Sequence, residues 1–261
     1  MRGCATTWDE VAAVVDLVSR EYRGRLDLSA ASRVKAHDTA SATARADEAR
    51  NERGEWARGK TAKLPGAHGG ATILTLGDGS KVVRKTGTKD AMDREQLAAS
   101  VARAVGAPAP KVTRVAPGEI HQEYIAGRTG KQWAESQGQD AVDELRQTDQ
   151  GRRIGLLDYV TRNNDRHNEN WMVDRQGRPV AIDNGAAFSG EEWQGGDFAP
   201  VDGPDVTEDE ARAARASLAA LKPEFEAAGQ AGWYAAVMNQ INKQVQYTIS
   251  EQAAGGTGDQ P

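Results

Sequence analysis

The hydrophobic positions of residues 1–63 predict one amphipathic helix followed by a solvated segment. A capping box of Thr7 and Glu10 predicts where that helix starts. Apolar residues then recur at steps of three and four, at Trp8, Val11, Val15, Val18 and Tyr22. Residues 35–63 are rich in charge and lack an apolar face, which indicates a solvated helix that runs into a linker. We therefore expect a helical extension over residues 1–63, whose apolar face packs on its own chain or contacts a partner.

Short apolar runs over residues 64–125 predict a small antiparallel sheet with one helix. Runs at residues 71–76 and 81–85 flank a tight turn that contains Gly77 and Gly79. Further runs at residues 112–115 and 120–125 add two strand candidates. Residues 91–105 lie between the two pairs and have a helical pattern, started by acidic residues and stopped by glycine and proline. This order predicts an α+β fold that begins with a small sheet lobe.

Helical periodicity dominates residues 126–250. Residues 131–147 predict a partly amphipathic helix, and Thr148 or Asp149 caps the next one. A second capping box, Thr207 with Glu210, opens a helix that runs to Leu221. Apolar residues then repeat every four positions, at Trp233, Val237, Ile241, Val245 and Ile249. We expect a helical lobe over residues 126–250 and a disordered polar tail over residues 251–261.

Composition narrows the class of protein. The chain has 261 residues, 27% of them charged, and a net charge of −5, so it lacks the basic field that nucleic-acid binding requires. Cys4 is the only cysteine, which fits a reducing compartment. Acidic residues interrupt any signal sequence near the N-terminus, and no run of 18 apolar residues occurs. We expect a cytoplasmic protein without membrane insertion.

The chemistry concentrates in residues 163–188. Asp165 is followed after four residues by Asn170, the D-x-x-x-x-N spacing of a kinase catalytic loop. Two short apolar runs, residues 171–173 and 179–182, flank a turn that contains Gly177, which predicts a hairpin. The hairpin would bring Asn170 beside Asp183, and two such oxygen ligands suit a hard cation bound to phosphates.

The sequence DRHNEN followed by IDNG resembles the D-R-H-x-x-N and I-D-x-G motifs of phosphatidylinositol 3- and 4-kinases. The D-N-G variant is similar to that of the secretory-pathway casein kinases, and HipA-type bacterial kinases share the general layout. The resemblance implies a bilobal protein-kinase-like fold with ATP and Mg²⁺, or Mn²⁺, as cofactors. It implies that Asp165 is the catalytic base, that Asn170 and Asp183 are metal ligands, and that Arg166 and His167 buttress the loop.

Residues of the small lobe complete the predicted nucleotide site. Lys85 ends a strand and would contact the α- and β-phosphates, while Glu95 on the following helix would pair with it. Arg84 and Asp93 are the near alternatives to this pair. By position, Gly69 and Gly70 would let backbone N–H groups approach phosphate. The hinge that meets adenine would then comprise Glu123, Tyr124 and Ile125.

Other interpretations of these residues are possible. An EF-hand counted from Asp165 would need glycine and glutamate where Asn170 and Gln176 stand, so we reject it. His121 and His167 lack a second histidine or cysteine at metal-ligand spacing, which makes zinc a poor fit. A polar loop and hairpin that carry acids without catalytic function remain an alternative.

The sequence therefore predicts an ATP-dependent phosphotransferase whose acceptor is a hydroxyl group of a protein Ser/Thr or of a small molecule. Two other classes stay open. One is a nucleotide-binding pseudokinase that acts as a regulatory module. The other is a structural protein of a phage particle, because the run RNERGEWARGK resembles linkers in phage structural proteins.

Overall fold

The computed structural model describes residues 61–63 and 71–255. The chain divides into two compact units, Met1–Gly59 and Lys60–Pro261. The expected N-terminal helix and residues 35–60 of the expected linker lie outside the described residues, as do Gly69 and Gly70. Residues 61–63, which were expected to end the linker, form a strand of the second unit.

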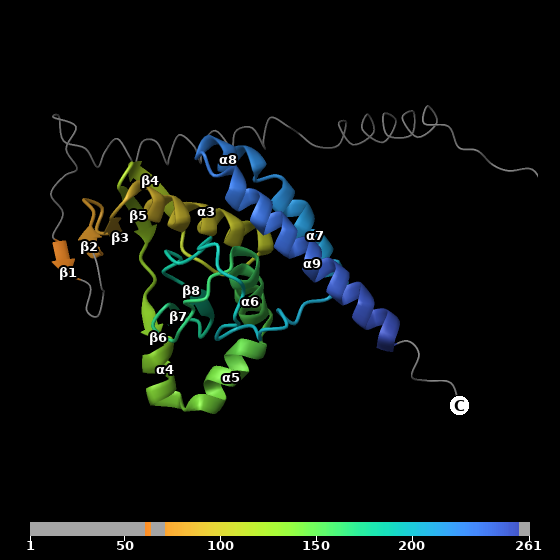
Figure 1. The fold of residues 1–261 in the computed structure, drawn as a ribbon. Helices are drawn as coiled ribbons and strands as arrows, with labels where there is room; N and C mark the ends of the chain where they lie inside the picture. The colour runs from red at the N-terminus through yellow and green to blue at the C-terminus, as the bar shows by residue number, and fades with distance from the viewer. Residues whose placement is uncertain (1–60, 64–70, 256–261) are drawn as a thin grey trace, which may run out of the picture. The chain divides into compact units, whose positions relative to one another are not determined.

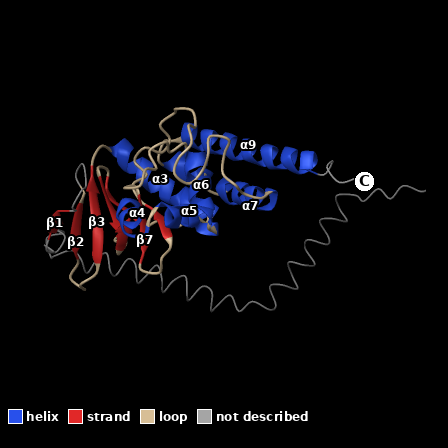
Figure 2. Cartoon of the chain, turned by 90° about the horizontal axis from the view of Figure 1, so that it is seen from below, coloured by secondary structure: helices blue, strands red, loops and turns tan. Residues whose placement is uncertain are grey.

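The first part of this unit is a five-stranded antiparallel sheet in the order β1-β2-β3-β5-β4. Figure 2 shows its strands gathered on one side, apart from most of the helices. The strands are β1 (Thr61–Lys63), β2 (Thr72–Thr75), β3 (Lys81–Thr86), β4 (Val112–Ala116) and β5 (Glu119–Glu123). The register places Lys85 of β3 opposite Ile120 of β5, so these two side chains share one face of the sheet.

Helix α3 (Lys89–Val105) follows β3 and packs against β4 and β5 (Figure 1). It begins two residues before the predicted start at residue 91, because the Thr88 side chain caps it by accepting from the Ala91 backbone N–H. It ends at Gly106, whose left-handed φ of 71° suits glycine. Glu95 lies on its buried face.

The predicted catalytic hairpin is present as β7 (Trp171–Asp174) and β8 (Pro179–Ala181), which pair antiparallel. A strand that the sequence analysis did not anticipate, β6 (Gly127–Thr129), pairs with β7 and completes a three-stranded sheet. The strand β6 has only three residues, too few to show a period in the sequence. It anchors the chain directly after the expected hinge.

Helices, together with loops such as residues 182–207, make up the remainder of the described chain. These helices are α4 (Gly130–Gln137), α5 (Gln139–Gln147), α6 (Asp149–Thr161), α7 (Glu208–Ala219), α8 (Lys222–Ala227) and α9 (Ala231–Gly255). The capping roles of Thr148 and of the Thr207–Glu210 box are confirmed. None of the described helices is long and apolar enough to cross a membrane.

Two predicted boundaries are wrong. Residues 131–147 form two helices instead of one, because Gly138 lies between them with a φ of 90°, which no helix allows. The predicted tail at 251–261 starts too early, since α9 continues to Gly255 and residues 256–261 lie outside the described residues. Residues 251–254 are good helix formers, which extend α9 beyond its apolar stripe.

One hydrophobic core joins α3, α6, α7 and α9 to the β7–β8 hairpin. Trp171 of β7 is fully buried and meets Phe198 edge to face, with 5.1 Å between ring centroids. Because α6 packs against α3, α9 and β8, it fixes the position of the loop that follows it. The expected fold class is confirmed: an α+β chain with small antiparallel sheets and a helical part.

Substitution of Gly155 tests how closely α6 packs on the segment around Phe198. A Cβ at this position would lie 2.4 Å from the Phe198 carbonyl oxygen, whereas one at Gly232 of α9 would meet nothing within 4 Å. Glycine to alanine inside a helix ordinarily stabilises by about 1 kcal/mol. We expect Gly232→Ala to stabilise the protein and Gly155→Ala to destabilise it, as measured by chemical denaturation. Equal effects of the two substitutions would contradict this packing.

Candidate active site

Lys85 is the residue that joins the small sheet to the catalytic hairpin. Its Nζ donates to Glu95 Oε1 at 2.5 Å and to Asp183 Oδ1 at 3.2 Å. Lys85 comes from β3 and Glu95 from α3, while Asp183 follows β8. Two consecutive elements and a third that is distant in sequence therefore bring one ammonium group and two carboxylates together.

The near alternatives to the Lys85–Glu95 pair have other partners. Arg84 points to the opposite face of β3 from Lys85 and makes two hydrogen bonds to Glu119, at 2.8 and 2.7 Å. Asp93 accepts from Lys89 and from Arg114 on β4. The contact expected between Lys85 and Glu95 is thus the one that the structure contains.

Lys85 stabilises both carboxylates of this cluster, although burial, together with the charge of Asp183, raises the pKa of Glu95 above its usual value. Burial by itself would lower the pKa of Lys85, but attraction to Glu95 and Asp183 raises it above its usual value. Burial opposes ionisation of Asp183 as well, yet the neighbouring Lys85 ammonium keeps its pKa below the usual value. At neutral pH the site therefore presents a charged lysine and an ionised Asp183.

Asp165 lies on the loop after α6 with 62% of its side chain exposed. Asn170 holds it in place, because the Asn170 Nδ2 donates to the Asp165 carbonyl at 2.7 Å and to Oδ2 at 3.1 Å. The carboxylate of Asp165 is thus fixed by the loop and exposed to solvent. An exposed and positioned carboxylate of this kind can accept a proton from a hydroxyl group.

Arg166, by contrast, is buried, with 2% of the residue exposed. Its guanidinium donates to both carboxylate oxygens of Asp158 on α6, at 2.9 to 3.2 Å. It also donates to the carbonyls of Asn170 and Ile182 and to the Asn184 side chain. The loop, the hairpin and α6 therefore share one buried cation.

The sequence analysis did not identify Asp158 or Asn184. Asp158 stands between Leu157 and Tyr159 in a helix with an apolar stripe, and it is buried. The feature that could have identified it is an aspartate among the apolar positions of a helix. Carboxylates are almost never fully buried without a partner, so this position indicated a buried cation without showing which one. Nothing in the sequence around Asn184 separates it from an ordinary turn residue.

His167 supports the loop only locally. Its Nδ1 accepts from the Glu169 backbone N–H at 3.2 Å, and its Nε2 lies 3.8 Å from Asp165 Oδ1. Half of the side chain is exposed. His167 therefore shapes the turn after Asp165, while Arg166 carries the long-range contacts.

The hairpin places the two expected metal ligands near one another. The Ile182 N–H donates to the Asn170 carbonyl at 3.0 Å, so Asp183 follows directly after the residue that faces Asn170. Among the described residues, no group of three or more His, Cys, Asp and Glu side chains could hold a metal ion. One carboxylate and one amide are the small set that suits Mg²⁺, which keeps water and substrate phosphates as its other ligands. The residues present therefore fit a nucleotide-bound cation.

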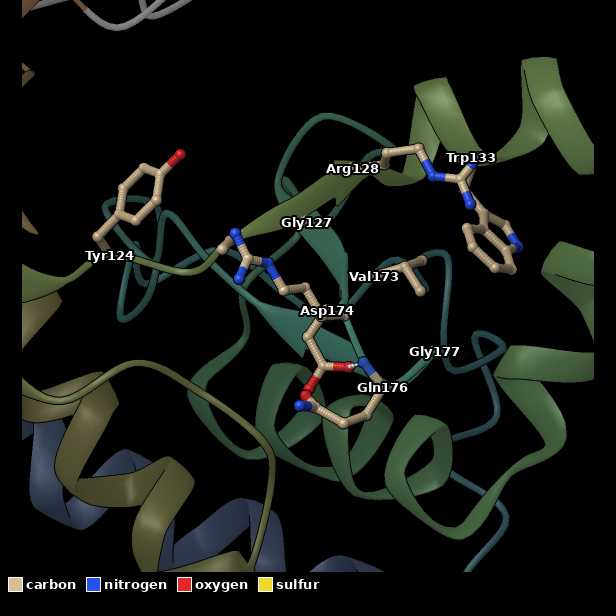
Figure 3. Close-up of a pocket in the computed structure, with 10 residues that line it drawn as sticks. Tyr124, Gly127, Arg128, Trp133, Val173, Asp174, Gln176 and Gly177 are labelled. Atoms are coloured by element: carbon tan, nitrogen blue, oxygen red, sulfur yellow. Dashed lines mark hydrogen bonds between the residues drawn. The ribbon is translucent and has the colours of Figure 1, made fainter.

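The expected hinge borders a separate pocket of about 710 Å³. Figure 3 shows it between the start of β6, helix α4 and the turn of the β7–β8 hairpin. It is lined by Tyr124, Ala126, Gly127, Arg128, Trp133, Val173, Asp174, Arg175, Gln176 and Gly177. Neither Lys85 nor Asp183 takes part, because the pocket lies at the far end of β7, roughly 13 Å of strand from Asn170.

The three expected hinge residues differ in their surroundings. The Glu123 N–H donates to the Lys111 carbonyl at 2.8 Å, and its carboxylate accepts from the Lys111 N–H at 3.3 Å. Tyr124 and Ile125 follow the end of β5, and Lys81 lies over the Tyr124 ring at 5.5 Å. Glu123 is therefore part of the sheet, and the connection to β6 consists of residues 124–126.

The segment after Phe188 is tied to the catalytic loop by Asn164. The Asn164 Nδ2 donates to the Glu192 carbonyl at 2.9 Å, and its Oδ1 accepts from the Gln194 N–H at 3.1 Å. Trp193 between them packs edge to face on Tyr159 of α6. The side chains of Asn164 and Trp193 thus position this segment beside Asp165 without phosphorylation.

A lysine that pairs with a helix glutamate and also donates to an aspartate after a hairpin is the arrangement of kinase-type phosphotransferases. Residues 133–222 match the family model described as phosphatidylinositol 3- and 4-kinase. This stretch contains Asp165, Asn170 and Asp183, whereas Lys85 and Glu95 precede it. The site and the family match together support a phosphotransferase.

Among solved structures, the chain is similar to the crystal structure of a Helicobacter pylori proinflammatory kinase, CtkA. The identity is 10%, the TM-score is 0.42, and the similarity covers 71% of this chain and 91% of that chain. No match was found among the curated proteins.

Proposed function

We propose that this protein is an ATP-dependent kinase that transfers the γ-phosphoryl group to a hydroxyl acceptor. The observation that carries the proposal is the contact of Lys85 with both Glu95 and Asp183. A lysine held in this way is placed to neutralise phosphate oxygens next to a metal ligand. The match of residues 133–222 to a kinase family supports the same assignment.

Each residue has a role in this proposal. Lys85 binds the α- and β-phosphates and Glu95 orients it. Asn170 and Asp183 hold Mg²⁺, with Mn²⁺ as the alternative cation, and the cation supplies charge neutralisation on the phosphates when bound. Asp165 accepts the proton of the acceptor hydroxyl. Arg166 and His167 maintain the loop that carries Asp165.

The proposed acceptor is a protein Ser/Thr or a small-molecule hydroxyl, although the matching family is named for lipid substrates. A lipid kinase needs a basic and aromatic surface for its membrane. The catalytic loop instead contains the exposed Glu169 and contacts the segment that carries the exposed Glu191 and Glu192. Acidic side chains would repel an anionic lipid surface, which favours an acceptor in solution.

Substitution of Asp183 tests the metal role. We expect Asp183→Ala to abolish the Mg²⁺-dependent thermal shift that ATP produces in the unsubstituted protein, because one of two protein ligands is lost. The measurement is a titration of ATP with and without Mg²⁺, followed by differential scanning fluorimetry. Asp143→Ala is the control, since Asp143 lies on α5, outside the hairpin and the pocket, and forms an ion pair with Arg146.

An unaltered shift in Asp183→Ala would refute the metal role of this residue. A thermal shift in the unsubstituted protein and in the control variant, without phosphoryl transfer from labelled ATP to any acceptor or to water, would instead indicate a nucleotide-binding pseudokinase. Absence of any shift in the unsubstituted protein would refute the proposed function itself.

A further inference from the structure

Asp183 has an unusual backbone conformation for a residue with a side chain. Its φ is 55°, in the left-handed region that few residues other than glycine adopt. Such a conformation persists when the surrounding contacts determine it. The neighbours of Asp183 should therefore include a residue that fixes this turn of the chain.

Asn184 makes two contacts that meet this requirement. Its backbone N–H donates to Glu95 Oε2 at 3.1 Å, and its side-chain Oδ1 accepts from the Arg166 guanidinium. Only 3% of Asn184 is exposed. The peptide next to Asp183 is thus attached to α3 on one side and to the buried cation on the other.

These contacts form one continuous series across the site. Lys85 and the Asn184 N–H share the two oxygens of the Glu95 carboxylate. Arg166 shares its nitrogen atoms between Asp158 and Asn184. Asn184 is the residue that links the Lys85–Glu95 pair to the Arg166–Asp158 pair, and it does so directly beside Asp183.

We infer that Asn184 is a positioning residue, whose two contacts hold the Asp183 carboxylate in the orientation that binds a nucleotide-bound divalent cation. The inference deepens the proposed function and rests on it. An apolar side chain of the same shape keeps the backbone contact to Glu95 but removes the acceptor for Arg166. Asn184 then keeps its backbone contacts to Glu95 and Ala187 and loses its side-chain attachment to Arg166.

The first test is the cation requirement of nucleotide binding. We expect Asn184→Leu to raise the Mg²⁺ concentration for half-maximal ATP binding by about 10-fold or more, as residues behind metal ligands typically do when replaced. Asn184→Asp retains an acceptor for Arg166 and should restore a requirement close to that of the unsubstituted protein. Calorimetry at fixed ATP and variable Mg²⁺ measures this quantity apart from turnover.

The second test uses the ligand-free protein. Hydrogen exchange followed by mass spectrometry should show faster exchange of the peptide that contains residues 183–185 in Asn184→Leu. Thr161→Val is the matched control, because it removes another buried hydrogen bond, to the Leu157 carbonyl, without touching Asn184. That control should leave both the exchange at 183–185 and the Mg²⁺ requirement unchanged.

The outcomes distinguish a failure of the role inferred for Asn184 from a failure of the proposed function. Unchanged exchange and an unchanged Mg²⁺ requirement in Asn184→Leu, with the unsubstituted protein binding ATP normally, would overturn the role of Asn184 alone. Equal changes in Thr161→Val would show a general loss of stability and would overturn it as well. An unsubstituted protein that binds no Mg²⁺–ATP would contradict the proposed function, and the inference with it.

Discussion

Asp165→Ala should lower turnover by about 10²- to 10⁴-fold, the range that a positioned acid–base group contributes. Nucleotide binding should persist, because the shorter of the two hydrogen bonds that the Asn170 side chain donates goes to the Asp165 backbone carbonyl, which alanine retains. The substitution thus removes the proton acceptor and leaves the metal ligand in place. Transfer of label from ATP, together with the ATP thermal shift, measures the two effects separately.

Glu169→Ala is the matched control for this experiment. Glu169 lies in the same loop, is about as exposed as Asp165, and its carboxylate contacts only the exposed Lys131 at 3.2 Å. Its removal changes the charge by the same amount, and exposed pairs contribute little. Phosphorylation by Asp165→Ala at the rate of Glu169→Ala would end the assignment of Asp165 as the base.

Asp158→Ala should destabilise the protein by about 3–5 kcal/mol, because it leaves the Arg166 cation buried without its carboxylate partner. Both residues are almost completely inaccessible, at 1% and 2% exposure. The loss should appear as a lower midpoint of chemical denaturation followed by circular dichroism. Arg166 also contacts the carbonyls before and after the catalytic hairpin, so the variant should lose Mg²⁺-dependent ATP binding together with stability.

Asp143→Ala provides the comparison for Asp158. It removes a half-exposed carboxylate from an arginine pair within helix α5, for which an effect of about 0–1 kcal/mol is typical. Asp158→Asn should fall between the two, since the amide still offers one acceptor to Arg166. If Asp158→Ala were no more destabilising than Asp143→Ala, the buried pair would not support the loop as described.

Local sequence patterns predicted most of the elements that surround the site. The hairpin, α3 and the capped starts of α6 and α7 follow from short-range turn and cap chemistry, which acts over a few residues. The short β6 and the break at Gly138 were not predicted. The strand β6 depends on which segment lies alongside, because it forms by pairing with β7, more than 40 residues later in the sequence.

The sequence likewise predicted only part of the candidate site. The spacing of Asp165, Asn170 and Asp183 could be read from the sequence, because one loop and one hairpin connect these residues. The resemblance implied that Arg166 supports the loop, but the partners of Arg166 could not be read from the sequence, and Asn184 could not be distinguished from an ordinary polar residue of a loop. Their partners, Asp158 and Glu95, lie on helices that only packing brings to them.

The sequence by itself determined the order of helices and strands and the set of groups able to hold a phosphate-bound cation, since periodicity, caps and motif spacing are local properties. Only the tertiary structure decided that Lys85 meets Glu95 and Asp183, the latter 98 residues away in the chain. Strand β3, helix α3 and the β7–β8 hairpin had to pack together for these two contacts to form. Such packing follows from burial of a shared core, which no short stretch of sequence encodes.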